Sequence, residues 1–168
     1  VGYAATLSGN MSKTVVNWSQ GDFNEGITIG STADVNLSGV SGYGWTEPMY
    51  WSNETASQDT PSDKSSSSYI RNLTLQDIEY MKVQIDSNKM GEDIDLHLYR
   101  DKNSNGVIDW SSELMESSGS GGSNEICELD NPANGKWWIV VHGYDLASNN
   151  TTFWLQVKMV GGYSLIVD

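Results

Sequence analysis

The chain of 168 residues contains one cysteine, two histidines and only nine Lys and Arg residues. Cys127 has no second thiol with which to pair, so an internal disulfide is excluded, and stability has to come from the core or from a bound metal. The few basic residues stand against 22 Asp and Glu, which gives a formal charge of −13. This balance disfavours nucleic acid and anionic membranes as partners. No apolar run reaches the roughly 18 residues of a membrane span.

The residues that favour helices, Ala, Lys and Arg, are scarce, whereas Ser, Thr, Gly and Asn are abundant. Such a polar, uncharged and turn-rich composition is common in extracellular β-proteins. The length suits one domain, or one domain with an appended arm, and is sufficient to bury a core. The composition therefore predicts an all-β fold.

Asn-x-Ser/Thr sequons are more frequent than this composition gives by chance, and they favour an exported, glycosylated protein that is secreted or held at the cell surface. The sequons begin at Asn10, Asn17, Asn36, Asn53, Asn72, Asn149 and Asn150. The chain begins with Val1 and not with Met. We therefore expect it to be a processed or excised piece of a larger protein.

Two regions divide the chain. Residues 1–42 hold short apolar groups separated by Gly, Ser and Asn, and they predict an N-terminal arm or extra strands whose affiliation stays open. Residues 43–168 form the main domain, in which the polar stretch 52–68 is interpreted as a linker-like surface loop.

Alternation of apolar and polar residues predicts strands in the main domain, because successive side chains of a strand point to opposite faces. The clearest are 78–86, 93–99, 136–143 and 153–160. In the last of these, Phe153 and Leu155 are expected to face inward. Residues 110–115 are interpreted as one helical turn. Several short strands joined by turn-rich loops predict a β-sandwich or jelly roll.

A loop rich in oxygen ligands follows the strand at 93–99. Asp101, Asn103, Asn105, Gly106 and Asp109 match positions 1, 3, 5, 6 and 9 of the D-x-[DN]-x-[DN]-G calcium loop. Alternate side chains of such a loop point toward a hard cation, and the carbonyl oxygen of the seventh residue, here Val107, adds a ligand. This spacing predicts a Ca²⁺ site.

The calcium motif is incomplete at position 12, where an EF-hand carries a bidentate Glu and this chain has Ser112. The nearest carboxylate is Glu113, one residue later. The loop would then be closed by Glu113, or by Asp93 and Asp95 from the preceding strand. The alternative is an Asn/Gly-rich turn without metal.

Four segments resemble the pre-peptidase C-terminal domain, as found in archaeal pyrolysin-like subtilisin-type proteases. They are Asp93–Tyr99, Ser117–Glu125, Asn134–Tyr144 and the strand from Phe153. The resemblance implies a non-catalytic jelly-roll domain, often calcium-binding, that stabilises a secreted protease. Its partner would be the catalytic domain of the same polypeptide, and it could also engage protein substrate or cell-surface polysaccharide.

Catalysis has no recognisable basis in the sequence. Neither His97 nor His142 lies beside a nucleophile motif, and Gly-x-Ser-x-Gly is absent. We therefore expect this chain itself not to be an enzyme.

Aromatic residues leave another function open. Trp45, Tyr50 and Trp51 lie in a polar context and could form a platform for a sugar ring, so a carbohydrate-binding module is an alternative. A cell-surface layer or adhesion module is another, favoured by the sequons and the acidic surface.

Overall fold

The computed structural model describes residues 41–45 and 48–164. The described part is built from strands and one short 3₁₀ helix, η1, at Lys64–Ser66. The strands are β1 (Ser41–Trp45), β2 (Met49–Ser57), β3 (Tyr69–Leu75), β4 (Ile78–Asp86), β5 (Asp93–Arg100), β6 (Leu114–Ser118), β7 (Glu125–Asp130), β8 (Gly135–Asp145) and β9 (Asn150–Ser164). The all-β prediction is confirmed.

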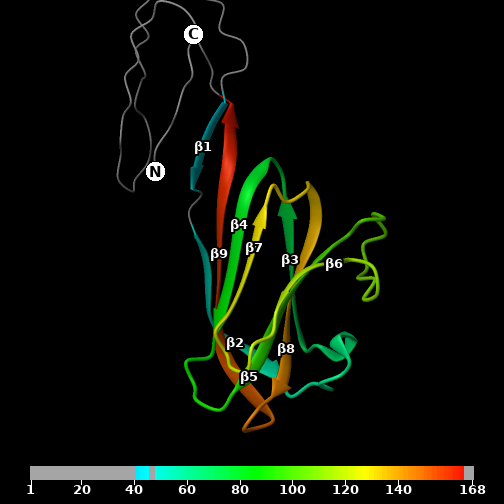
Figure 1. The fold of residues 1–168 in the computed structure, drawn as a ribbon, viewed down its shortest axis with the longest axis vertical. Coiled ribbons are helices and arrows are strands. Elements are labelled where there is room, and N and C mark those ends of the chain that lie inside the picture. The colour runs from blue at the N-terminus through cyan, green and yellow to red at the C-terminus, as the bar shows by residue number, and fades with distance from the viewer. Residues whose placement is uncertain (1–40, 46–47, 165–168) are drawn as a thin grey trace, which may run out of the picture.

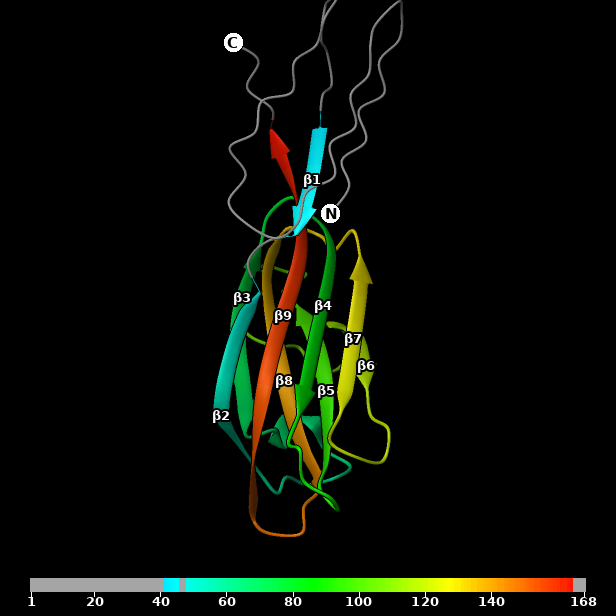
Figure 2. The same cartoon turned by 90° about the vertical axis from the view of Figure 1, so that its left-hand side faces the viewer.

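The strands form two antiparallel sheets that lie face to face (Figures 1 and 2). The first sheet has the order β1-β9-β4-β7, and β2 pairs with β9 along the same edge as β1. The second has the order β3-β8-β5-β6. This arrangement of two packed layers is that of a β-sandwich.

The core lies between the two sheets and follows the alternation of the strands. From the first sheet, Val83 of β4 and Leu155 of β9 are buried in it, and from the second sheet Leu96 of β5 and Ile139 of β8. Each of these side chains is at most 1% exposed. The period-2 pattern in the sequence therefore identified the inward faces correctly.

The outer face of the second sheet is also buried, because two loops lie across it. The loop 101–113 packs on Tyr99, and the segment that contains η1 reaches His142. Figure 1 shows both loops on the same side of the molecule. As a result, β5 is buried on both faces, as strands covered by other elements are.

Two segments that were not expected to form strands do contain them. Residues 52–57, expected to be part of the linker-like loop 52–68, belong to β2, and the rest of that segment contains η1. Residues 114–118 form β6, although one helical turn was expected over 110–115. Both are polar edge strands, in which pairing with one neighbouring strand outweighs weak strand propensity.

The predicted arm 1–42 is described only at its end. Residues 41–42 begin β1 and pair with β9, so they belong to the first sheet. Three sequon residues, Asn10, Asn17 and Asn36, lie outside the described residues, while the other four are exposed. Over the described ranges, no helix is both long enough and apolar enough to cross a membrane.

Candidate functional site

The loop 101–113 is wound around the side chain of Asp101. Its carboxylate accepts hydrogen bonds from the backbone N–H groups of Asn105, at 3.0 Å, and of Gly106, at 2.9 Å. Asn103 Oδ1 also accepts from Asn105 N, and Asn105 Oδ1 accepts from Val107 N. A carboxylate or amide oxygen has more than one lone pair, so these bonds leave acceptor capacity for a cation.

Two backbone positions in this loop have positive φ. Gly106 has a φ of +80°, which glycine adopts without steric cost, and Ser104 has a φ of +58°. The chain can therefore bend sharply at Gly106, which stands at position 6 of the motif.

Glu113 is the one buried carboxylate of the loop, with 1% of its surface exposed. One carboxylate oxygen accepts from Lys102 N at 3.0 Å, and the other accepts from Asp109 N at 2.9 Å. Glu113 thus joins the beginning of the loop to its end. These hydrogen bonds hold Glu113 inside the loop, and its expected role in closing a calcium site stays a prediction.

Asp109 lies at the surface and caps the turn that follows it. Its Oδ1 accepts from Ser111 N and Ser111 Oγ, at 3.0 and 2.6 Å. Hydrogen bonds from the side chains of Ser111 and Ser112 lower the pKa of Asp109 to about 2. The carboxylate is therefore ionised at neutral pH, which is the form that binds a metal.

Apolar contacts and Lys136 hold the loop against the second sheet, while Lys102 joins two parts of the loop itself. Ile108 and Trp110 pack on Tyr99 and Trp138, and the rings of Trp110 and Tyr99 meet edge to face with centroids 5.1 Å apart. Lys136 Nζ donates to the carbonyl oxygen of Gly106 at 2.9 Å, which ties the loop to β8. Lys102 Nζ donates to the carbonyl oxygen of Ser112 at 2.6 Å.

Asp93 and Asp95 do not contact this loop. They stand at the opposite end of β5 from Asp101, and a strand of that length spans on the order of 20 Å. Asp93 Oδ1 accepts from Gly122 N at 3.1 Å, and Asp95 lies against Gly119. These two residues form a second acidic cluster with the buried Glu125.

The second cluster concentrates negative charge in a half-buried position. Glu125 is fully buried and accepts hydrogen bonds from Ser118 Oγ and from the N–H and Oγ of Ser120. Burial, and then the charges of Asp93 and Glu125, raise the pKa of Asp95 to about 6. In the described ranges, however, no three His, Cys, Asp or Glu side chains come together as a metal-binding group.

His97 and His142 lie beside each other on β5 and β8 under the segment that contains η1. His142 Nδ1 is 3.0 Å from Ser67 Oγ and 3.6 Å from the carboxylate of Asp59. In a catalytic triad the nucleophile and the carboxylate contact opposite nitrogens of the imidazole, whereas here both contact Nδ1. Ser67 Oγ also donates to the carbonyl oxygen of Lys64, so its proton is engaged. This cluster is a buried structural network.

Of the residues expected to form an aromatic platform, Tyr50 and Trp51 do not share one face. Trp51 packs against the core, and the guanidinium of Arg71 lies 4.3 Å from its ring centroid. Tyr50 points outward and is 55% exposed. Trp45 belongs to β1, and its side chain lies outside the described part.

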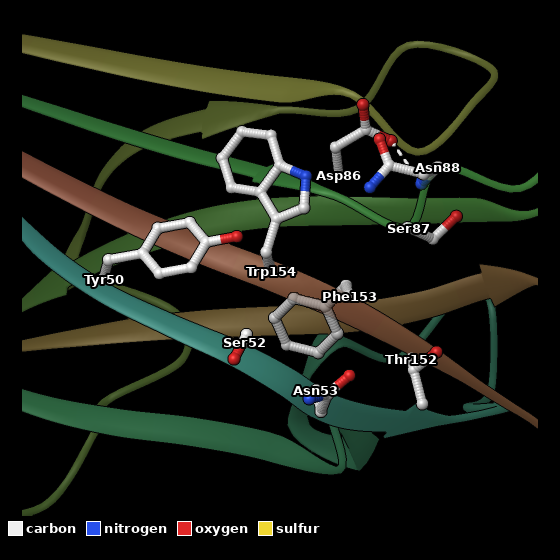
Figure 3. Close-up of a pocket in the computed structure, with 9 residues that line it drawn as sticks. All are labelled: Tyr50, Ser52, Asn53, Asp86, Ser87, Asn88, Thr152, Phe153 and Trp154. Atoms are coloured by element: carbon white, nitrogen blue, oxygen red, sulfur yellow. Dashed lines mark hydrogen bonds between the residues drawn. The ribbon is translucent and has the colours of Figure 1, made fainter.

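The ring beside Tyr50 belongs to Trp154 of β9. The two ring planes differ by 26°, with centroids 6.1 Å apart, and both residues line a cleft (Figure 3). Trp154 was not among the residues predicted to form the platform. The signal was present, because Phe153 and Leu155 were predicted to face inward, and alternation then turns Trp154 outward.

No family model and no curated protein matches this chain.

Proposed function

We propose that this chain is a non-catalytic, calcium-binding accessory domain of an exported subtilisin-like protease, and that it stabilises the enzyme. The observation that carries the proposal is the loop 101–113, which is wound around Asp101 and joined at its two ends by the buried Glu113. The resemblance of four sequence segments to pre-peptidase C-terminal domains and the β-sandwich arrangement support it.

The donors of the loop suit calcium better than a transition metal. They are carboxylate, amide and carbonyl oxygens, with neither His nor Cys between residues 101 and 113. Hard Ca²⁺ prefers such oxygens, whereas zinc and copper favour nitrogen and sulfur. The residues that would hold the ion are Asp101, Asn103, Asn105, Asp109 and the carbonyl of Val107, and Glu113 would complete the set.

The ion would act on stability through the folded state. Asp101 and Asp109 bring like charges into one short loop, and a cation that binds only the folded chain relieves this repulsion. Such binding adds RT ln(1 + [Ca²⁺]/Kd), which is about 2.7 kcal/mol at a hundredfold excess over Kd. This is a sizeable share of the roughly 5–15 kcal/mol that stabilises a typical domain. An extracellular location, favoured by the four exposed sequons, would supply the calcium.

Thermal unfolding in EDTA and in millimolar Ca²⁺ tests the proposal. We expect Ca²⁺ to raise the melting temperature of the wild-type chain by several degrees. The double variant Asp101→Ala with Asp109→Ala should lose this increase. The matched control, Asp130→Ala with Asp145→Ala, removes two exposed carboxylates elsewhere and should keep it.

An equal melting temperature for the wild-type chain in EDTA and in Ca²⁺ would rule out the calcium mechanism. The loop 101–113 would then be a turn held by its own hydrogen bonds. A calcium response that survives in the Asp101/Asp109 variant would place the ion elsewhere and would also contradict the proposal.

A further inference from the structure

We propose that the cleft beside Tyr50 and Trp154 binds a neutral pyranose ring, presented by a polysaccharide outside the chain. The cleft is formed by β2, the end of β4 and the start of β9, and it has a volume of about 190 Å³ (Figure 3). This is smaller than the roughly 300–1,000 Å³ of pockets that take drug-sized ligands, and it suits one ring of a longer polymer.

The aromatic side of the cleft fits the flat face of a sugar. Tyr50 and Trp154 present ring faces inclined by only 26° to each other. The C–H groups on one face of a pyranose carry a partial positive charge, and the face of an aromatic ring is negative. Tyr50 is 55% exposed although it is a large aromatic residue. Its ring can therefore be covered by a ligand without rearrangement of the core.

A β-bulge in β2 sets polar side chains opposite Trp154. In the register of β2 with β9, Trp51 pairs with Leu155 and Glu54 pairs with Phe153, so two residues of β2 oppose the single residue Trp154. The two residues are Ser52 and Asn53, and both line the cleft. Bulges of this kind redirect side chains and are frequent next to binding sites.

Two of the polar groups at the cleft are held in an uncommon backbone conformation. Asn53 has a φ of +59°, and Asn88, in the turn after β4, has a φ of +56°. Asn tolerates this left-handed region better than most residues but still adopts it at some cost. Within the described part of the chain, neither side-chain amide has a hydrogen-bond partner. Both can therefore donate to and accept from sugar hydroxyl groups.

Asp86 completes the polar side of the cleft and selects against acidic sugars. Its Oδ1 accepts from Asn88 N at 2.7 Å and from Ser123 Oγ at 2.9 Å, which fixes the carboxylate in place. The other carboxylate oxygen can accept a sugar hydroxyl. A negative charge at this position, on a chain of net charge −13, would repel uronic acids and sulfated sugars. The ligand class is therefore a neutral polysaccharide.

This inference does not depend on the proposed calcium site. The cleft lies on the first sheet, whereas the loop 101–113 packs on the outer face of the second sheet. Sugar binding should therefore be the same in Ca²⁺ and in EDTA at a temperature where the chain stays folded. A failure of one proposal leaves the other measurable.

Isothermal titration calorimetry on the full chain tests the cleft. The protein should be produced in a host without N-glycosylation, so that Asn53 carries no sugar. The probes are the hexasaccharides of β-1,4-linked glucose, N-acetylglucosamine and mannose, with hexagalacturonate as the acidic comparison. We expect at least one neutral hexasaccharide to bind and hexagalacturonate to bind at least tenfold more weakly.

The variants separate stacking from folding. Tyr50→Ala and Trp154→Ala should each weaken binding at least tenfold, while Tyr50→Phe, which keeps the ring, should change it less than threefold. Tyr144→Ala is the matched control, because Tyr144 is 43% exposed but lies outside the cleft. Because Trp154 is half-buried, the melting curve of Trp154→Ala should be measured as well. If Trp154→Ala is unfolded, the conclusion depends on Tyr50→Ala.

Three results would overturn the inference. They are the absence of binding by every neutral hexasaccharide, equal affinities of the Tyr50→Ala, Tyr144→Ala and wild-type chains, and preferential binding of hexagalacturonate.

Discussion

The imidazole rings of His97 and His142 lie with centroids 6.3 Å apart on the adjacent strands β5 and β8, and both are at most 2% exposed. Within the described residues, neither nitrogen of His97 has a hydrogen-bond partner. Burial, and then the nearby Lys64 and His142, lower the pKa of His97 to about 4. His97 is therefore neutral in the folded chain above about pH 4.

His97 and Asp95 should impose opposite pH dependences on stability. The pKa of His97 falls from 6.5 to about 4 on folding, so its contribution is full above pH 6.5 and is lost as the pH falls toward 4. The pKa of Asp95 rises from 3.8 to about 6, so its contribution is full below 3.8 and is lost as the pH rises toward 6. Between about pH 4 and 6 the two slopes cancel in part.

Single variants should expose each slope. In urea unfolding between pH 4 and 6.5, Asp95→Asn should make stability rise more steeply with pH than in the wild type, and His97→Gln should make it rise less or fall. Slopes that stay equal in all three proteins would show that neither group titrates as the structure implies.

Gly143→Ala should destabilise the chain strongly. A Cβ at this position would lie 2.1 Å from the carbonyl oxygen of Ser57, and β8 meets the segment after β2 there through the bridge between Gln58 and Gly143. Relief requires the backbone to move, so we expect a loss of about 3 kcal/mol or more in urea unfolding. Gly121→Ala is the control, because no atom lies within 4 Å of its added Cβ, and it should change stability by less than about 0.5 kcal/mol. Similar losses in both variants would contradict this close approach.

Glu113→Ala should cost more than Glu113→Gln. The alanine variant removes the buried acceptor of the N–H groups of Lys102 and Asp109, at about 1–3 kcal/mol for each hydrogen bond. The glutamine variant keeps one acceptor oxygen and should lose about half as much. Urea unfolding in EDTA measures this hydrogen-bonding role apart from any metal. Equal losses would mean that the one acceptor oxygen kept by glutamine contributes nothing, and would contradict this account of the two hydrogen bonds.

Arg71→Lys should destabilise the chain although it keeps the charge. The Arg71 guanidinium lies over the Trp51 ring. It donates one hydrogen bond to Glu54 Oε1 at 3.0 Å and another to the Tyr69 hydroxyl at 2.7 Å. A lysine ammonium cannot stack and form both bonds from one plane. We expect a loss of about 1–2 kcal/mol, mostly from packing, because an ion pair exposed to this degree contributes little. If 1 M NaCl removed the difference in stability between the wild type and Arg71→Lys, the charge interactions of Arg71, and not its packing, would be the main cause.

A glycan on Asn53 should block the cleft. Asn53 begins a sequon, is exposed and lines the cleft beside Trp154. Chain produced with N-glycosylation at this site should therefore bind the neutral hexasaccharides at least tenfold more weakly than unglycosylated chain. Glycosylation at Asn72, on the other sheet, should have no such effect. Calorimetry on both forms, with Asn72→Gln as the comparison, measures this.

The strands with one apolar face and one polar face were predicted from the sequence. The segment 78–86 is β4 with the same bounds, because its inward Met81 and Val83 alternate with polar residues. The polar strands β2 and β6 were missed, since pairing with a neighbouring strand, and not local propensity, forms them. Alternation with Leu96 and Leu98 places His97 on the outer face of β5, but it does not show that a loop covers that face.

The two candidate sites differ in how much of each could be predicted from the sequence. The positive φ at Gly106 and the order of oxygen-bearing side chains in loop 101–113 are local features, so spacing in the sequence could indicate them. The cleft depends on the register of β2 against β9 and on the bulge between Trp51 and Glu54, which bring Tyr50 beside Trp154. A shift of one residue in the pairing of β2 with β9 would exchange the two faces of β2. Without that register, the sequence does not show which of the adjacent residues Tyr50 and Trp51 points outward.

The pairing of β1 with β9 has a mechanical consequence. Ser41 and Ser164 are register partners at the outer end of this antiparallel pair, so both described ends of the domain leave it side by side. A force that pulls those two residues apart would break the hydrogen bonds between β1 and β9 one after another from that end, and would not load all of them at once. Tension between modules joined on either side would peel β1 from β9 first and leave the two-layered core closed.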